Sequence, residues 1–287
     1  MSTQLSRQSF RVAQANQLKE LLDRVREAVK PLKHIVVIMS GKGGVGKSVI
    51  SASLALVLRR LGRSVAILDA DIHGPSIPWL LGIEGGRMFF SESTGKIVPV
   101  EGSLGVGVVS VELALDRKDA PLAWRGPLKT KAITDLVSMT DWSSYEYLIV
   151  DLPPGTGDEA LTVTRFLSPK LSGIVLVLTP GKMVAHVVGK ARNFAYIVGS
   201  PILGAVLNMA YFKCPVCGTV HRLFGEVGDL GVELLAELPL DPRVSELADR
   251  GELHKLIESG SGEWVDGVFK MGREVLSRLE GKGVEGS

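Results

Sequence analysis

Residues 41–48 read Gly41-Lys42-Gly43-Gly44-Val45-Gly46-Lys47-Ser48, which matches the phosphate-binding pattern G-x-x-x-x-G-K-[ST]. The run before this stretch predicts a buried strand, and the run after it predicts a helix. Glycines suit such a loop because, without Cβ atoms, successive backbone N–H groups can point at phosphate oxygens, and the helix N-terminus adds further free donors. The stretch therefore predicts a nucleoside triphosphate site in which Lys47 reaches the terminal phosphates and the Ser48 hydroxyl binds Mg²⁺.

Along the rest of the chain, short runs of branched apolar residues alternate with helical patterns. The predicted strands are His34–Met39, Ser64–Leu68, Tyr147–Val150, Gly173–Leu178 and Ile202–Leu207, and the predicted helices are Lys47–Arg60, Leu128–Met139, Asp158–Leu167 and Met183–Val198. Continuous apolar strands are typical of strands buried on both faces, and this alternation favours parallel pairing with right-handed crossovers. We therefore predict an α/β fold, a doubly wound, mostly parallel sheet of the P-loop NTPase type with helices on both faces.

Two segments depart from this alternation. Ile97–Glu112 contains several glycines among valines, which predicts a hairpin inserted in the sheet. Trp264–Leu279 has the spacing of an amphipathic helix whose apolar side belongs to the core. Its polar side mixes acidic and basic residues, whereas a membrane-targeting helix is basic on that side.

The chain divides into a helical extension, residues 1–31, and a P-loop ATPase domain, residues 32–287, with a cysteine loop near residues 214–218. Apolar residues recur in the extension at three- and four-residue spacing, and Pro31 limits its helix. We expect this helix to pack on the main domain rather than to bind a partner.

Acidic residues follow two of the predicted strands. Asp151 ends the strand Tyr147–Val150, where a carboxylate commonly holds the Mg²⁺ of a P-loop site, and the loop after it can respond to the γ-phosphate. Asp69 and Asp71 follow the strand Ser64–Leu68, and a carboxylate there can orient the attacking water. Helix capping or turn formation is the alternative for both, because Asp favours both positions.

The overall composition narrows the class of protein. The chain has 287 residues, 45% of them hydrophobic, and 33 Lys and Arg against 31 Asp and Glu give a net charge of +2. This balance disfavours a sequence-independent nucleic-acid binder, which must neutralise many phosphates. The apolar runs fall short of the ~20 residues that cross a bilayer. The start of the chain is polar and lacks the apolar core of a secretory signal, so we expect a cytoplasmic protein without nucleic-acid or membrane partners.

Both cysteines of the chain, Cys214 and Cys217, lie in the stretch Cys-Pro-Val-Cys-Gly, which is typical of a metal knuckle. Two thiolates fill half of a four-coordinate site, and a two-fold axis through it would supply the other half. An iron–sulfur cluster and a structural zinc both use such a Cys₄ shell. A redox pair is the alternative, but a thioredoxin-like pair opens a helix directly after a strand, and we expect several loop residues before Cys214.

Lys42, directly after the first glycine of the loop, resembles the signature lysine of the deviant Walker A class, which includes MinD, ParA and the Mrp/ApbC iron–sulfur carriers. Further stretches are similar to the Mrp/ApbC family in particular, and together they cover roughly residues 32 to 280. These stretches are Leu68–Ser76, Trp124–Pro127, Asp151–Asp158, Asn208–Met209, Cys214–Gly218 and Pro239–Pro242.

This resemblance implies a homodimeric, slow ATPase that binds ATP, Mg²⁺ and a [4Fe–4S] cluster between two subunits and passes the cluster from a donor to apoproteins. It also implies that Lys42 reaches the partner's phosphates, that Asp71 positions the attacking water and that Asn208 contacts the adenine. A spatial-organisation ATPase of the MinD or ParA kind and a nucleotide-gated zinc scaffold are the alternatives. The nitrogenase iron protein is excluded, because its ligands are two separated single cysteines.

Overall fold

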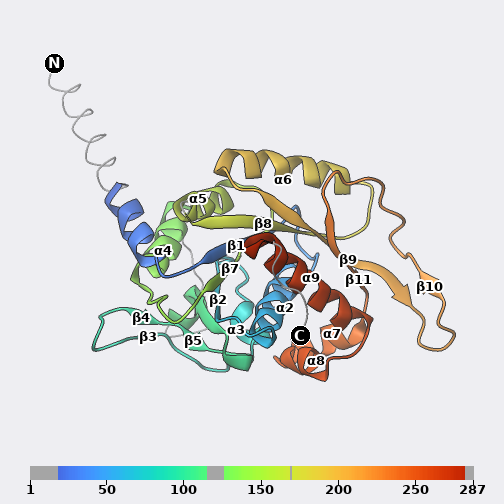
Figure 1. The fold of residues 1–287 in the computed structure, drawn as a ribbon, viewed down its shortest axis with the longest axis horizontal. Coiled ribbons are helices and arrows are strands. Elements are labelled where there is room, and N and C mark those ends of the chain that lie inside the picture. Colours follow the sequence, from blue (N-terminus) through green and yellow to red (C-terminus); the bar gives the residue numbers. More distant parts are fainter. Residues whose placement is uncertain (1–18, 115–125, 169, 282–287) are drawn as a thin grey trace, which may run out of the picture.

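The computed structural model describes residues 19–114, 126–168 and 170–281 (Figure 1). Strands of these residues form one sheet in the order β10-β9-β8-β1-β7-β2-β6-β5, and β11 also pairs with β9. Its strands are β1 His34–Ser40, β2 Val65–Asp69, β5 Val100–Glu101, β6 Gly107–Ser110, β7 Tyr147–Asp151, β8 Leu171–Leu178, β9 Ile202–Lys213, β10 Val220–His221 and β11 Leu234–Pro239. All pairs are parallel except β5–β6 and β9–β10.

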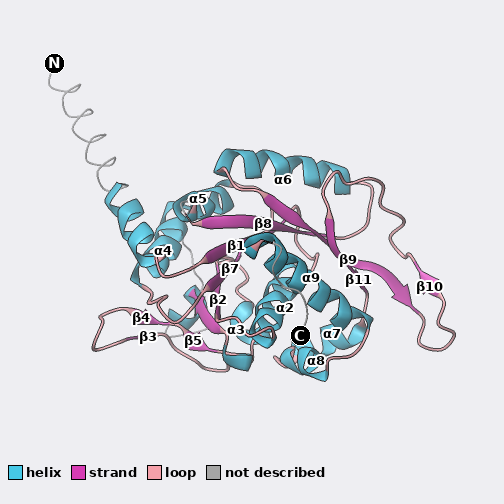
Figure 2. Cartoon of the chain, viewed as in Figure 1, coloured by secondary structure: helices cyan, strands magenta, loops and turns pink. Residues whose placement is uncertain are grey.

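Helices cover both faces of this sheet, as Figure 2 shows. One face packs against α2 Lys47–Arg60, α3 Ile77–Leu80, α7 Pro242–Asp249, α8 His254–Ser259 and α9 Glu263–Glu280. The other face packs against α4 Gly126–Met139, α5 Asp158–Leu167, α6 Val184–Val198 and the helical residues 19–28. The predicted fold class is therefore confirmed, because the β-strands are mostly parallel and a separate apolar core fills each side.

The register of the central strands determines where the functional residues meet. Asp151 at the end of β7 pairs with Ile38 of β1 on one side and with Asp69 of β2 on the other. The backbone N–H of Ala70 also donates to the carbonyl of Asp151 at 2.9 Å. Parallel strands present their carboxyl ends at one edge, so the loop after β1 and the carboxylates of β2 and β7 lie together there.

The second half of the predicted hairpin at Ile97–Glu112 is part of the main sheet and forms one edge of it. β5 and β6 pair antiparallel, and β6 also pairs parallel with β2. The start of the segment, β4 Ile97–Val98, leaves the main sheet and pairs with β3 Phe89–Phe90. β5 is the outer strand at this edge of the sheet, and such a short edge strand offers little backbone for pairing with another strand.

The two ends of the described chain both contribute to the core. Val25, Val29 and Leu32 are buried on the α4–α5 face, so the described part of the N-terminal helix packs on the domain. The boundary at residue 31 stays a prediction, since residues 1–18 lie outside the described residues. At the other end, Trp264 and Val268 of α9 are fully buried, which confirms the interpretation of this helix as core. The motif residues Trp124 and Arg125 also lie outside the described residues.

Candidate functional site

The phosphate loop needs glycine at particular positions. Gly44 and Gly46 have φ values of 75° and 82°, in the left-handed region that favours glycine. A Cβ atom at Gly46 would lie 2.4 Å from Nδ2 of Asn208, and one at Gly41 would lie 2.2 Å from Cγ1 of Val187. The conformation and the crowding both exclude larger residues, so the loop keeps the open backbone that phosphate binding requires.

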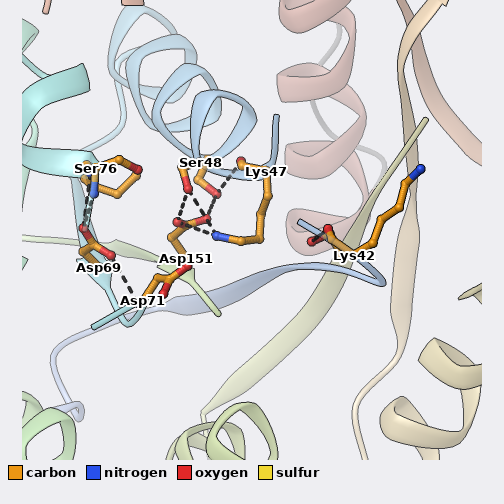
Figure 3. A network of polar contacts seen from close by, with 10 residues as sticks. Lys42, Lys47, Ser48, Asp69, Asp71, Ser76 and Asp151 are labelled. Atoms are coloured by element: carbon orange, nitrogen blue, oxygen red, sulfur yellow. Dashed lines mark hydrogen bonds and ion pairs between the residues drawn. The ribbon is translucent and has the colours of Figure 1, made fainter. Parts of the chain in front are cut away.

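Lys47 and Asp151 form a buried ion pair beneath this loop (Figure 3). Nζ of Lys47 lies 2.6 Å from Oδ2 of Asp151, and the two side chains are 7% and 0% exposed. The Ser48 hydroxyl donates to the same oxygen at 2.7 Å, and the Ser51 hydroxyl donates to Oδ1 at 2.5 Å. The structure thus brings together three residues predicted from the sequence and adds Ser51, one helical turn after Lys47.

Asp69 is buried and acts on the local backbone. Its carboxylate accepts from the backbone N–H groups of Asp71, Ser76 and Ile77 at 3.1–3.2 Å. Burial, together with the negative charge of Asp151, raises the pKa of Asp69 well above its usual value, and these backbone hydrogen bonds act in the opposite direction. Asp69 therefore takes the capping and turn role that the sequence left open, and it shapes the loop that carries Asp71.

Asp71 is half-buried and lines the main cavity of the site. Among the described residues its carboxylate has no hydrogen-bond partner, so it is available to bind a water. The loop that follows Asp151 is fixed to the end of β1, just before the phosphate loop, because the backbone N–H of Gly155 donates to the carbonyl of Ser40 at 2.8 Å. Both loops next to the expected γ-phosphate position are therefore anchored at the sheet edge.

The cavity extends away from the phosphate loop and has a volume of about 490 Å³. Its far wall consists of Trp79, Leu80, Pro239, Leu240, Asp241, Val244, Ser245, Ala248, Asp249 and Trp264. Trp79 is held there by a hydrogen bond from its Nε1 to the carbonyl of Ala248 at 3.0 Å. The sequence did not predict that Trp79 and α7 line this cavity. The stretch Pro239–Pro242, which leads into α7, was the signal for the α7 part.

Asn208 lies between the two ends of this cavity. Its Nδ2 donates to the backbone carbonyl of Val45 at 2.9 Å, and its side chain is 6% exposed. The next residue, Met209, has a φ of 54°, a conformation that few non-glycine residues adopt. Asn208 therefore braces the phosphate loop, and its expected contact with adenine stays a prediction.

Lys42 differs from Lys47 in its exposure and in the direction of its side chain. Figure 3 shows its side chain extending away from Lys47 and Asp151. Lys42 is exposed, and it forms no ion pair with any other residue that the structure describes. An exposed cation beside a phosphate loop can reach a group on another molecule.

The cysteines lie at the tip of a hairpin formed by β9 and β10. Lys213 pairs with Val220, and the backbone N–H of Cys214 donates to the carbonyl of Thr219 at 2.9 Å. The expectation of several loop residues before Cys214 is wrong, because β9 continues to Lys213 through its pairing with β10. The residues after Cys214 form a turn rather than a helix, so the geometry of a thioredoxin-like pair is still not met.

Local hydrogen bonds favour the thiolate of Cys217. Its Sγ lies 3.2 Å from Oγ1 of Thr219. The Thr219 hydroxyl and backbone N–H hold the pKa of the Cys217 thiol below its ordinary value, because donors stabilise the negative sulfur. Thiolates are the form that binds iron and zinc.

In the described residues there is no group of three or more His, Cys, Asp and Glu side chains that could hold a metal ion. The hairpin of one chain therefore offers two sulfur ligands and no third ligand from this part of the chain. The described helices also include none that is long and apolar enough to span a membrane.

The fold and the phosphate site together define a P-loop NTPase of the deviant Walker A class. The family described as ParA, NUBPL iron-transfer P-loop NTPase, matches residues 31–271, and the chain belongs to this family. It is 42% identical over 256 residues to the iron-sulfur cluster carrier protein of Saccharolobus solfataricus, covering 87% of this chain and 86% of that protein.

Solved structures agree with this assignment. A nucleotide-binding protein from Archaeoglobus fulgidus, solved in complex with ADP, superposes with a TM-score of 0.73 at 36% identity, covering 85% of this chain and 95% of that one. The septum site-determining protein MinD of Pyrococcus horikoshii, complexed with Mg-ADP, superposes with a TM-score of 0.61 at 22% identity, covering 86% and 97%. The second similarity concerns the fold alone.

Proposed function

We propose that this protein is a cytoplasmic, slowly hydrolysing ATPase that carries a [4Fe–4S] cluster between two subunits and transfers it from a cluster donor to apoproteins. The observation that carries the proposal is the cysteine pair at the tip of the β9–β10 hairpin, with Cys214 half-buried, Cys217 exposed and no third ligand among the described residues. A four-coordinate cluster site needs two such pairs, and a two-fold axis supplies them. The family and the named carrier from Saccharolobus solfataricus support the same function.

The nucleotide part of the proposal follows from the buried ion pair. Lys47 and Asp151 form a buried ion pair at the base of the loop. When ATP binds, the Lys47 ammonium turns to the terminal phosphate oxygens, and the Asp151 carboxylate and Ser48 hydroxyl become available to a cation. These oxygen donors suit Mg²⁺, which neutralises phosphate charge when bound. Gly41–Gly46 supply the backbone donors around the phosphates, with the Val45 carbonyl already held by Asn208.

The test is anaerobic reconstitution of the full chain with iron and sulfide, followed by metal analysis, absorption spectroscopy and transfer to an apoprotein. We expect about four iron per dimer and cluster transfer to the acceptor. Zinc bound in place of iron after anaerobic purification would favour the zinc scaffold, and the absence of any metal would favour a MinD-like or ParA-like role.

Lys42→Ala should separate nucleotide binding from hydrolysis. The Lys42 side chain extends away from Lys47 and Asp151 (Figure 3), so we propose that it contacts the phosphates of the partner subunit. The variant should keep ATP affinity within about threefold of wild type. It should lose most hydrolysis, on the order of 10²-fold, and the ATP-dependent tightening of the dimer. Titration calorimetry, phosphate release and light scattering measure these three properties. Equal hydrolysis in variant and wild type would contradict the contact across the dimer.

Asp71→Asn and Asp151→Asn should have different effects. Asp71 lines the cavity, and its carboxylate has no hydrogen-bond partner among the residues that the structure describes, so its loss should slow hydrolysis by about 10²- to 10⁴-fold while ATP with Mg²⁺ still binds. Asp151 is surrounded by Lys47, Ser48 and Ser51, so its loss should raise the Mg²⁺ concentration needed for half-maximal activity. Magnesium titrations of the turnover rate distinguish the two. Identical magnesium dependence in both variants would show that these roles are assigned wrongly.

A further inference from the structure

One long segment of the chain has a charge balance unlike the rest. Residues 160–225 contain seven Lys and Arg and no Asp or Glu, although the whole chain carries nearly equal numbers of both signs. The segment includes most of α5, all of β8, α6 and β9, and the cysteine hairpin. Lys213 and Arg222 pair with Glu263 and Glu237 outside the segment, so the cations that remain for a partner lie on and near α6.

The outer face of α6 is the most exposed part of this segment. His186, Lys190, Asn193 and Ile197 recur at intervals of four, three and four residues, which places them in one stripe along the helix. All four are exposed, and Tyr196 beside them is 88% exposed. The opposite side of α6 is the core side, formed by Val184, Val188, Ala191, Phe194, Ala195 and Val198. Figure 1 shows α6 as the outermost layer on its side of the sheet, so no described element covers the stripe.

The cations near this stripe have no carboxylate partner among the residues that the structure describes. Lys182, just before α6, and Lys190 form no ion pair with any other residue in the described parts of the chain. Arg192 donates only to the backbone carbonyl of Gly231. Cations gathered on one part of the surface repel one another, and an anionic partner removes that cost.

We propose that this face of α6 binds an acidic protein partner. The cations would contact carboxylates at the rim, and Tyr196 and Ile197 would pack against apolar side chains, which gives the polar rim and apolar centre of a protein interface. A second copy of this face would bring the same positive charge, which disfavours α6 against α6. Anionic lipid fits less well, because the exposed large apolar residues of α6 are confined to its last turn.

The position of α6 places such a partner near the cysteines. Arg192 ties α6 to Gly231 in the segment that follows the hairpin, and the Val187 side chain lies against Gly41 of the phosphate loop. A partner bound to α6 would thus sit on a helix that contacts both the phosphate loop and the segment after the cysteine hairpin. Its identity as a cluster acceptor rests on the proposed function, whereas its binding to α6 does not.

The test uses the full chain and an acidic apo-ferredoxin of the [4Fe–4S] type as the probe. Lys182→Glu/Lys190→Glu reverses two charges on α6, and Lys270→Glu/Arg273→Glu reverses two exposed charges on α9, in the other helical layer, as a matched control. We expect the α6 variant to bind apo-ferredoxin at least tenfold more weakly at low salt, with a flatter salt dependence, and the control to bind like wild type. Tyr196→Ala should weaken binding without changing the salt dependence.

Binding is measured by titration calorimetry on cluster-free protein, so this result does not depend on reconstitution. Circular dichroism melting confirms that each variant is folded. The proposal is overturned if wild type does not bind the apo-ferredoxin, or if both double variants lose affinity equally. It is also overturned if duplex DNA or phosphatidylserine vesicles bind more tightly than the ferredoxin in an α6-dependent way. Failure of cluster reconstitution alone would reject the proposed function and leave the docking surface standing.

Discussion

Cys214→Ala and Cys217→Ala are each expected to remove nearly all iron from the reconstituted dimer. In a site shared across a two-fold axis, each single substitution removes two of four sulfur ligands at once. A site within one chain would lose one ligand and could keep a partly occupied cluster. We therefore expect iron to fall from about four per dimer to near zero in both variants, as measured by metal analysis and absorption.

Two controls make this prediction specific to the sulfur ligands. Val216→Ala changes a residue between the cysteines that is 92% exposed, and it should leave the iron content unchanged. ATP affinity should survive in both cysteine variants, because Lys47 and Ser48 begin α2 and Asp151 ends β7, so none of them belongs to the hairpin. A cluster retained by the Cys214→Ala/Cys217→Ala double variant would rule out the hairpin as the site.

The parts of the fold that could be predicted from the sequence depend on local patterns. The strand before the phosphate loop and the helix after it follow from continuous apolar residues and from the glycines between them. The carboxylates of Asp71 and Asp151 could be placed at one sheet edge because both follow predicted parallel strands. The contact of Lys47 with Asp151 follows from that placement, since both residues lie where the carboxyl ends meet.

The parts that could not be predicted depend on contacts distant in sequence. The second half of β9 is extended because it pairs with β10 and, at Tyr211, with Pro239 of β11. The segment Leu234–Pro239 has no period of two, and it is a strand because β9 offers a free edge. Asn208 reaches the Val45 carbonyl because β9 lies close to the phosphate loop in the folded sheet. The sequence motif around Asn208 does not show this contact, so its bracing role could not be predicted.

The role of Asp69 also could not be decided from the sequence. Its sequence context is equally compatible with water orientation and with capping, and the choice depends on where Ser76 and Ile77 place their N–H groups. Because those donors surround Asp69, its neighbour Asp71 remains the carboxylate that faces the cavity. Adjacent acidic residues can thus take separate roles that only the loop conformation determines.

Lys47→Ala should have the largest effect on the nucleotide site, through two separate causes. The loss of the cation that we propose contacts the terminal phosphates should reduce hydrolysis by about 10²- to 10³-fold and remove productive ATP binding. Asp151 would also remain fully buried without its cation, and breaking a buried pair from one side typically costs about 3–5 kcal/mol of the free energy of unfolding. Phosphate release and denaturant unfolding measure these effects independently.

The double variant Lys47→Met/Asp151→Asn separates the two causes. It replaces both charges by neutral groups of similar size, so the unfolding free energy should return toward the wild-type value. Hydrolysis should not return even at saturating Mg²⁺, which offsets the loss of Asp151, because methionine offers the terminal phosphates no positive charge. If the double variant recovered turnover together with stability, Lys47 would be needed only to neutralise Asp151, and the proposed exchange of Asp151 for phosphate oxygens would be wrong.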